Sequence, residues 1–299
     1  MKKQNLYAII AAFIWGTAFV AQSVGADTVT PFAFNMSRSL IATIFLCLVV
    51  FLISLYKKKK SETIEKTNNK KLFIGGILCG TALSVATALQ QASLSDTAAG
   101  KAGFITALYI VIVPILSIFL KKRAPFTVWV SVIIAVIGLY FLCVKGDFSV
   151  GKSDVLLILC AFVFSIQILL IDYFAAFVDG IKLSCVQFAT STVLSFLGMA
   201  VFETFDFNAI INCAVPILYL GVFSSGIAYT LQILAQKDSN PTVITLLLSL
   251  ESVFSVISGA ILLGDKLSFK EYIGCFLMFL AVILAQLPTD VFSIKRKKY

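Results

Sequence analysis

Long apolar runs, separated by short polar stretches, make up almost the whole chain. A helix needs about 20 residues to cross the ~30 Å hydrocarbon core of a bilayer, and ten runs reach or approach that length. They cover residues 6–25, 31–56, 72–94, 101–120, 126–144, 154–174, 182–203, 213–235, 241–263 and 269–287. The pattern therefore predicts an all-α polytopic membrane protein with ten transmembrane helices.

Prolines help to place the helix ends. Pro31, Pro125 and Pro241 fall at expected helix starts, where the missing N–H does no harm. Pro114 falls inside the fourth run, where it predicts a kink.

The basic residues predict the orientation. With the N-terminus inside, the inside segments hold 18 Lys and Arg, most of them in the long loop 57–71 and the two termini, while the outside loops hold five. Because basic loops stay on the cytoplasmic side, both termini are predicted to be cytoplasmic in an inner or plasma membrane. The formal charge of +9 is then a topology signal that suits an anionic inner leaflet, and we expect no nucleic-acid partner.

The N-terminal run also has features of a secretory signal peptide, because two lysines precede it and small residues follow. At least nine further apolar runs follow it. We therefore interpret it as the first span.

The composition argues against several classes of site. The chain is 60% hydrophobic and 13% charged, has no histidine, and carries seven scattered cysteines without a CxxC pair, so it predicts neither a metal centre nor a disulfide framework. The HExxH, Walker A and GxSxG motifs are missing. We expect a protein that is not an enzyme and needs no cofactor.

The two halves of the chain resemble each other. "AFIWGT" (12–17) aligns with "AFVFSI" (161–166) at an offset of 149, which also places Arg38 on Gln187; "TALQQASLSDTAA" (87–99) aligns with "YTLQILAQKDSNP" (229–241) at an offset of 142. Chance similarity between Leu-, Ala- and Phe-rich helices is the alternative, but three separate anchors agree. Since each half holds five spans, an odd number, the second copy must be inverted. The domains are then residues 1–147 and residues 148–299, the second with a basic cytoplasmic tail.

Several segments resemble one known family. They include "FIWGTAFVAQ", Pro31 with Arg38, "AGKAGFITALYIVIVP" and "VWVSVIIAVIGLYFL" in the first half, and "NPTVITLLLSLESVFSVISGAILLGDKLSFKEYIGCFLMFLAVIL" in the second. In their order and topology they resemble a ten-span EamA-type member of the drug/metabolite transporter superfamily, with one EamA repeat in each half. The chain departs from the family pattern at Glu251-Ser252, where Glu-Pro is common, and at "LGD" (263–265), where "LGE" is usual.

Two charged residues lie deep in apolar runs. Glu251 is ten residues into the ninth run, near the midplane, and Arg38 is seven residues past Pro31, about 10 Å below the outer face. For Arg38 three interpretations stay open: snorkelling to the headgroups, a structural tie to another helix, or a substrate or gating role beside Asn35. For Glu251 the alternatives are a cavity-facing proton or cation site and a neutral, hydrogen-bonded structural side chain.

Polar residues form two helical stripes that are related by the repeat. Such stripes predict opposite walls of a central cavity, although small and polar residues also serve helix packing in membranes. One stripe contains Gly80, Ser84, Thr87 and Gln91, and the other contains Ser225, Tyr229, Gln232 and Gln236.

Further candidates come from the first and fourth spans. Trp15, Phe19 and Gln22 share a helical face, and Tyr109 meets Glu251 at the offset of 142. These aromatic side chains either stack on a substrate or serve packing and the interfacial belt. Asp96 and Asp238, just outside the spans, are expected to cap helix N-termini.

The sequence thus predicts a secondary transporter that works by alternating access around a midplane site. Its expected partners are the lipid bilayer and a small organic solute such as an amino acid, another metabolite or an amphipathic compound, with a proton as the candidate coupling ion. Export is implied by the family resemblance, and the oligomeric state stays open. The rival hypotheses are a membrane-embedded enzyme acting on lipid-borne substrates, and a non-transporting scaffold or sensor.

Overall fold

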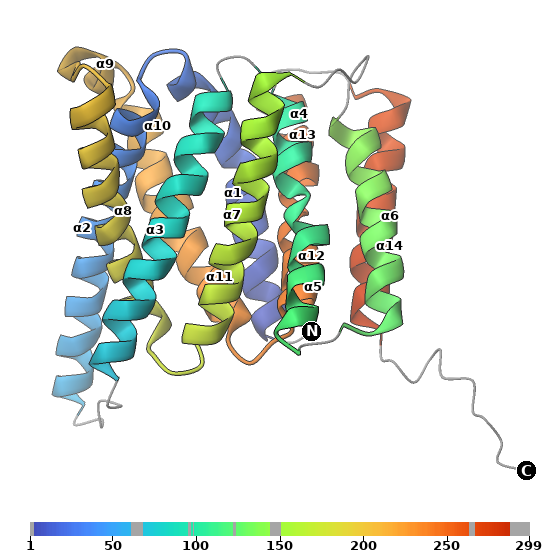
Figure 1. Ribbon diagram of the computed structural model, residues 1–299, viewed down its shortest axis with the longest axis horizontal. Helices are drawn as coiled ribbons and strands as arrows, with labels where there is room; N and C mark the ends of the chain where they lie inside the picture. The colour runs from blue at the N-terminus through green and yellow to red at the C-terminus, as the bar shows by residue number, and fades with distance from the viewer. Residues whose placement is uncertain are drawn as a thin grey trace, which may run out of the picture.

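The fold, a computed structural model, is a bundle of helices (Figure 1). The structure describes residues 3–60, 68–94, 97, 99–121, 124–143, 151–262 and 267–287. Its helices are α1 (Lys3–Ala26), α2 (Pro31–Lys59), α3 (Asn69–Ser93), α4 (Ala99–Ala107), α5 (Tyr109–Phe119), α6 (Phe126–Cys143), α7 (Lys152–Phe174), α8 (Gly180–Phe202), α9 (Phe207–Asn212), α10 (Ala214–Tyr219), the π-helix η1 (Leu220–Ala228), α11 (Tyr229–Gln236), α12 (Pro241–Leu248), α13 (Glu251–Leu262) and α14 (Phe269–Gln286).

Each expected run coincides with one helix or with consecutive helices. Within the described residues, eight helical segments are long and apolar enough to cross a membrane, and Phe126–Leu142 is a shorter apolar helix. The remaining expected run, the first, is the 24-residue helix α1, which is not among these nine segments, so ten spans remain a prediction. The all-α polytopic fold itself is confirmed.

The outer surface of the bundle is apolar. Phe119 is 80% exposed and Phe276 is 66% exposed, and large apolar side chains along α2 and α8 are also exposed. Patches of this extent are unusual in soluble proteins, whereas they suit a surface that faces hydrocarbon.

The helix contacts follow the repeat. α2 packs on α8 at one end of the bundle and α6 packs on α14 at the other (Figure 1), and the remaining contacts come in equivalent sets, such as α3 on α7 with α1 on α11. A hydrogen bond of 3.4 Å joins the hydroxyls of Thr43 and Thr192, which are 149 residues apart. Residues related by a two-fold operation can touch only near its axis, so this contact marks a pseudo-two-fold axis. The boundary between residues 147 and 148 lies outside the described residues.

The described ends of the helices agree with the expected alternation of sides. The start of α1, the end of α2, the α7–α8 turn and the α11–α12 turn lie at one end of the bundle (Figure 1). We call this end, which carries Lys57, Lys182 and Lys237, the basic end.

One expectation about helix caps is wrong. Asn240, not Asp238, caps α12, because its side chain accepts a hydrogen bond from the Thr242 backbone N–H. Asp238 instead has a φ of 60° in the preceding turn, a conformation that Asp tolerates better than most residues. Asp96 lies outside the described residues.

Candidate functional site

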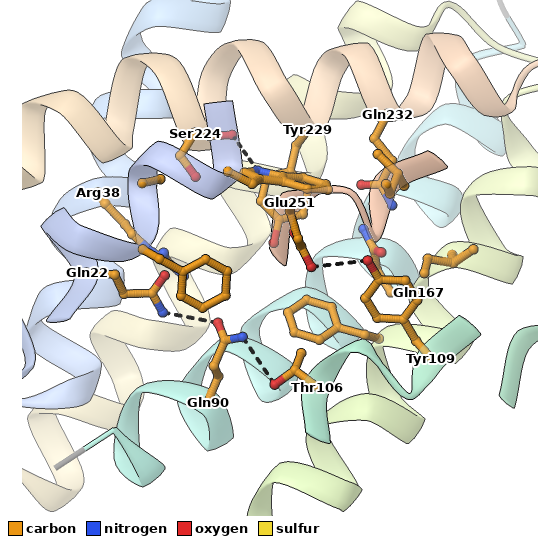
Figure 2. A pocket seen from close by; sticks show the side chains of 16 residues that line it. Gln22, Arg38, Gln90, Thr106, Tyr109, Gln167, Ser224, Tyr229, Gln232 and Glu251 are labelled. Atoms are coloured by element: carbon orange, nitrogen blue, oxygen red, sulfur yellow. Dashed lines mark hydrogen bonds between the residues drawn. The ribbon is translucent and has the colours of Figure 1, made fainter. Parts of the chain in front are cut away.

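A small cavity lies between helices of both repeats, and Figure 2 shows the side chains that line it. Its volume is about 60 Å³, room for only a few water molecules at roughly 10–15 Å³ each. Its lining residues are Trp15, Ala18, Phe19, Gln22, Arg38, Gln90, Thr106, Tyr109, Phe164, Gln167, Ile168, Ser224, Tyr229, Gln232, Leu248 and Glu251.

Two interrupted helices meet at this cavity. The turn at Leu108 separates α4 from α5, and the turn at Ser249 and Leu250 separates α12 from α13. At both breaks the backbone tightens, with Leu108 N–H donating to the Ile105 carbonyl at 3.2 Å and Leu250 N–H to the Leu247 carbonyl at 3.3 Å. Interrupted helices at the midplane are a recurrent feature of transporter binding sites.

A hydrogen bond joins the first residues after the two breaks. The Tyr109 hydroxyl donates to Glu251 Oε1 at 3.1 Å, and the two residues are 142 positions apart in the chain. They are therefore repeat equivalents in contact, like Thr43 and Thr192, and the site lies on the same pseudo-two-fold axis. Tyr109 and Glu251 are 5% and 8% exposed.

Most of the cavity lining is built from repeat-related pairs. Trp15, Ala18 and Phe19 correspond to Phe164, Gln167 and Ile168 at the offset of 149, while Gln90, Thr106 and Tyr109 correspond to Gln232, Leu248 and Glu251 at the offset of 142. Both halves of the chain thus contribute the same structural positions, but with different side chains. The cavity is symmetric in architecture and asymmetric in chemistry.

Hydrogen bonds order one wall of the cavity. Gln22 donates to Gln90 Oε1 at 3.1 Å, and Gln90 donates to the Thr106 hydroxyl at 3.5 Å (Figure 2). These contacts tie α1, α3 and α4 together. Amide groups held in this way keep further donors and acceptors for a polar solute.

Aromatic rings form another wall. The Trp15 and Tyr229 rings meet edge to face, with centroids 4.7 Å apart, and Tyr229 meets Phe188 in the same way at 5.4 Å. Trp15 Nε1 also donates to the Ser224 carbonyl at 3.4 Å. These contacts hold the rings rigidly on the cavity surface, where they offer apolar area at low entropic cost.

Arg38 faces the cavity rather than the headgroups. It is 6% exposed and lines the cavity with Glu251, so the snorkelling alternative does not describe this structure. Within the described part of the chain, Glu251 is bonded to Tyr109 and Arg38 has no carboxylate partner at ion-pair distance. The cavity therefore presents a cation and an acid that are not paired with each other.

The π-helix shifts one stripe of expected site residues. Tyr229 and Gln232 line the cavity as expected, but Ser224 takes the place expected for Ser225. In a π-helix the backbone hydrogen bonds join residue i to residue i+5, and here the Tyr229 N–H donates to the Ser224 carbonyl. Ser224 therefore lies one turn before Tyr229 on the same face of the helix. Ser225 is 1% exposed and packs away from the cavity.

Part of the stripe on α3 serves helix packing. Ser84, Thr87 and Gln91 do not line the cavity, whereas the neighbouring Gln90 does. The Ser84 hydroxyl lies 3.4 Å from that of Ser195 on α8, and a Cβ on Gly80 would come within 2.5 Å of the Gln187 carbonyl oxygen. Gly80 and Ser84 therefore bring α3 and α8 into close contact, as small polar residues do in membrane bundles, whereas the Thr87 hydroxyl donates to the Leu83 and Ser84 carbonyls of its own helix.

Two other expected site residues lie behind the lining. Gln187 accepts a hydrogen bond of 3.3 Å from Gln167 Nε2 and so supports a lining residue. Asn35 is fully buried, and neither its Oδ1 nor its Nδ2 has a hydrogen-bond partner among the described residues. Neither side chain lines the cavity.

Of the expected residues, the structure brings together Trp15, Phe19, Gln22, Arg38, Tyr109, Tyr229, Gln232 and Glu251. Sequence reasoning missed Phe164, Gln167 and Ile168, although the offset of 149 applied to Trp15 and Phe19 would have found Phe164 and Ile168. The offset of 142 would likewise have found Gln90 from Gln232. Ala18, Thr106 and Leu248 carry no polar or aromatic signal strong enough to single them out.

Comparison with known proteins agrees with this architecture. The profile of the EamA-like transporter family matches residues 2–144 and again residues 151–287. The chain belongs to the EamA-like transporter family. One match in each half agrees with the two-repeat layout, and a membership of this kind implies a small-molecule substrate and a lipid bilayer.

Similar proteins carry the same description. An Archaeoglobus fulgidus protein described as an uncharacterized transporter is 31% identical to this EamA-like chain, over 95% of this chain and 87% of that protein. A Clostridium kluyveri protein with the same description is 22% identical, over 95% and 93%. The crystal structure of another protein, 17% identical, superposes with a TM-score of 0.79 over 97% of this chain and 98% of that chain, so the two share a fold. This EamA-like protein is therefore a multi-pass membrane transporter.

Proposed function

We propose that this transporter exports small organic solutes by alternating access, with the central cavity as its solute site. The observation that carries the proposal is the contact of Tyr109 with Glu251, at the two helix breaks and on the pseudo-two-fold axis. A site on such an axis keeps equivalent distances to both repeats. It can therefore be opened to either side when the repeats rock.

The chemistry of the cavity favours solutes that carry both charge and apolar surface. Arg38 suits a carboxylate, Glu251 suits an amine or a proton, and the Trp15 and Tyr229 rings suit an apolar group. Amino acids, related metabolites and amphipathic compounds combine these features. Since the volume is only about 60 Å³, a solute of this class requires the repeats to separate slightly on binding.

Proton coupling through Glu251 is the proposed source of energy. A carboxyl group in the cavity can take up a proton from one side and release it to the other as the accessible side changes. Its hydrogen bond to Tyr109 links the carboxyl group to the opposite helix break, so protonation and the arrangement of the two repeats are mechanically connected.

The test is transport by purified protein in proteoliposomes. Solutes are first screened by thermal stabilisation, because a ligand that binds the native state raises Tm, and then followed as labelled flux. We expect Glu251→Gln to lower accumulation driven by a pH gradient at least tenfold while exchange of solute without a gradient continues. Tyr109→Phe keeps the ring and loses one hydrogen bond worth about 1 kcal/mol, so its flux is expected to fall only about fivefold.

Glu251→Asp is the matched control, because it keeps a carboxyl group at this position and should retain gradient-driven flux. If Glu251→Gln accumulates solute as the wild type does, proton coupling through this residue is wrong. If no variant in the cavity alters the flux of any solute, the cavity is not the solute site.

We further propose that the transporter lies in the plasma or inner membrane, with both termini and the basic end in the cytoplasm. The boundary between its two domains is proposed to lie between residues 147 and 148. A membrane-impermeant maleimide should label Asn208→Cys, at the opposite end, in intact cells. Ala176→Cys, at the basic end, should react only after permeabilisation. The reverse pattern would invert the topology and with it the direction of transport.

Two rival functions predict other results in the same assays. A membrane-embedded enzyme would convert a lipid-borne substrate and show no vectorial flux of a soluble one. A sensor or scaffold would bind a solute at the cavity and move none. Solute flux that depends on Glu251 and Arg38 separates transport from both.

A further inference from the structure

A second cavity lies at the basic end of the bundle, and none of its lining residues lines the first cavity. Its volume is about 320 Å³, and it is bounded by the last turns of α2, by the α7–α8 turn and by the end of α11. Among its lining residues are Lys57, Lys182 and Lys237. We call it the lysine pocket.

The charge of the lysine pocket is positive. Three ammonium groups face one carboxylate, that of Asp179, and Asp179 Oδ1 already accepts hydrogen bonds of 3.0 Å from the backbone N–H groups of Ile181 and Lys182 as the N-cap of α8. Within the described residues none of the three lysines has an ion-pair partner. An anion in the pocket would also lie beside the positive end of the α8 dipole.

The repeat relates the lysine pocket to the opposite end of the α2–α8 interface. There, Glu203 at the end of α8 reaches the start of α2: its carboxylate accepts from the Thr30 hydroxyl at 2.6 Å and from the Phe32 and Ala33 N–H groups at 2.8 and 2.9 Å. At the offset of 149 the counterpart of Glu203 is Ser54, a lysine-pocket residue. At the basic end the equivalent N–H groups, those of Ile181 and Lys182, are bonded by Asp179, the N-cap of α8 itself. The end of α2 therefore contributes only a short hydroxyl there, and a cavity lies beside it.

The walls of the lysine pocket are apolar and border the lipid-facing surface. Val50, Ile53 and Phe177 contribute to them, and the neighbouring Phe51 and Leu52 on α2 are 59% and 53% exposed. The Lys71 ammonium lies 3.3 Å from the centre of the Phe177 ring, which adds a further cation at the rim. A charged head with an apolar chain fits such a site better than a fully hydrated anion.

We propose that the lysine pocket binds the phosphate headgroup of an anionic phospholipid, with the acyl chains along the exposed face of α2. The headgroup phosphate would lie beside Ser54, among the side chains of Lys57, Lys182 and Lys237, and would join α2 to α8 there. Basic pockets between transmembrane helices recognise anionic headgroups in this way. The site is separate from the solute cavity and does not depend on what is transported.

The test is native mass spectrometry of the full-length protein in detergent, titrated with phosphatidylglycerol or with phosphatidylcholine of the same acyl chains. We expect saturable binding of one phosphatidylglycerol, with phosphatidylcholine at least tenfold weaker. Lys57→Gln/Lys182→Gln/Lys237→Gln should weaken phosphatidylglycerol binding at least about tenfold. The matched control Lys58→Gln/Lys59→Gln/Lys70→Gln removes the same charge from the same end outside the pocket and should leave binding unchanged.

A single substitution provides a second test if the triple variant does not fold. Ser54→Glu introduces the acid found at the equivalent position and should abolish phosphatidylglycerol binding, whereas the neutral Ser54→Gln of similar size should weaken it less. Equal binding of the two lipids, or equal losses in the pocket and control triples, would overturn the proposal. Displacement of phosphatidylglycerol by inorganic phosphate at millimolar concentration would also overturn it, because the ligand would then be a soluble anion.

Discussion

Arg38 is the residue at which function and stability oppose each other most clearly. The residue is 6% exposed and its guanidinium has no carboxylate partner at ion-pair distance within the described part of the chain, although burying a charge without a partner costs several kcal/mol. Residues that break a rule of stable packing in this way are often functional. Under the proposed function, a carboxylate of the solute would supply this partner.

Replacing Arg38 separates the two effects. We expect Arg38→Met, which keeps the length of the side chain and removes the charge, to raise Tm in detergent by a few degrees, since the desolvation cost disappears. The same variant should lower flux of carboxylate-bearing solutes at least tenfold, because a charge-assisted hydrogen bond is worth about 1.5–3 kcal/mol. Differential scanning fluorimetry and proteoliposome flux are the measurements.

Arg38→Lys is the control for charge alone and should restore part of the flux without the gain in Tm. A lower Tm in Arg38→Met combined with normal flux would show that Arg38 is a structural tie between helices, one of the interpretations that the sequence leaves open.

At the residue scale, sequence reasoning succeeded where a helix is regular. Trp15, Phe19 and Gln22 share a face on the continuous helix α1, and all three line the cavity. It failed by one position at Ser225, because the wider turn of the π-helix turns Ser224 inward. It also failed at Gln91, since adjacent glutamines on α3 differ only in which face the neighbouring helices cover.

At the element scale, the breaks in the two interrupted helices follow from packing rather than from local sequence. Pro114 suggested a kink in the first repeat, yet the turn lies earlier, at Leu108, and the second repeat breaks at the equivalent Leu250 without any proline. The stretch "TLLLSLES" reads as one continuous apolar helix, so periodicity could not reveal the second break. Its position depends on contacts made by other helices.

Gly16 allows α1 to pack closely against α13, next to the break between α12 and α13. A Cβ there would lie 2.8 Å from the Glu251 carbonyl oxygen and 2.8 Å from the Ser255 backbone nitrogen. Because both are backbone atoms, Gly16→Ala must push α1 away from α13 or displace Glu251. We expect this variant to lower the free energy of unfolding by about 1–3 kcal/mol, which is measured as a lower Tm. Flux should fall as well.

Gly103→Ala is the matched control, since the nearest atom to its added Cβ is Phe19 Cζ at 3.9 Å and alanine favours the helix by about 1 kcal/mol. It should leave flux unchanged and keep or raise Tm. Equal behaviour of the two variants would mean that the close approach of α1 to α13 does not position Glu251.

At the scale of the whole molecule, the repeat accounts for both the fold and the location of the cavity. In two helix pairs, α2–α8 and α6–α14, a helix packs on its own equivalent in the other repeat. These pairs stand at the two ends of the bundle (Figure 1). The all-helical fold and its two repeats could be predicted from apolar runs and offsets, while the count of ten spans stays a prediction. The contacts between the repeats could not, because they depend on side-chain shape across distant segments.

The α2–α8 interface also offers a direct test of rocking. Cys47 and Cys185 are free thiols whose sulfur atoms lie 3.5 Å apart across this interface, in its half nearer the basic end. A disulfide needs about 2.05 Å between the sulfur atoms, so a small adjustment allows mild oxidation to link the helices. Intact mass and mobility without reductant would measure the link, and Cys47→Ser should abolish it.

If transport requires the basic end of this interface to open, the disulfide must hold it closed. We expect oxidation to lower flux at least tenfold, reductant to restore it, and Cys47→Ser to be insensitive to both treatments. Solute binding from the opposite end, followed as a rise in Tm, should persist in the oxidised protein, because the central cavity is not altered. Full flux through a completely cross-linked protein would mean that α2 and α8 move as one body, and the opening at the basic end would then have to lie between other helices.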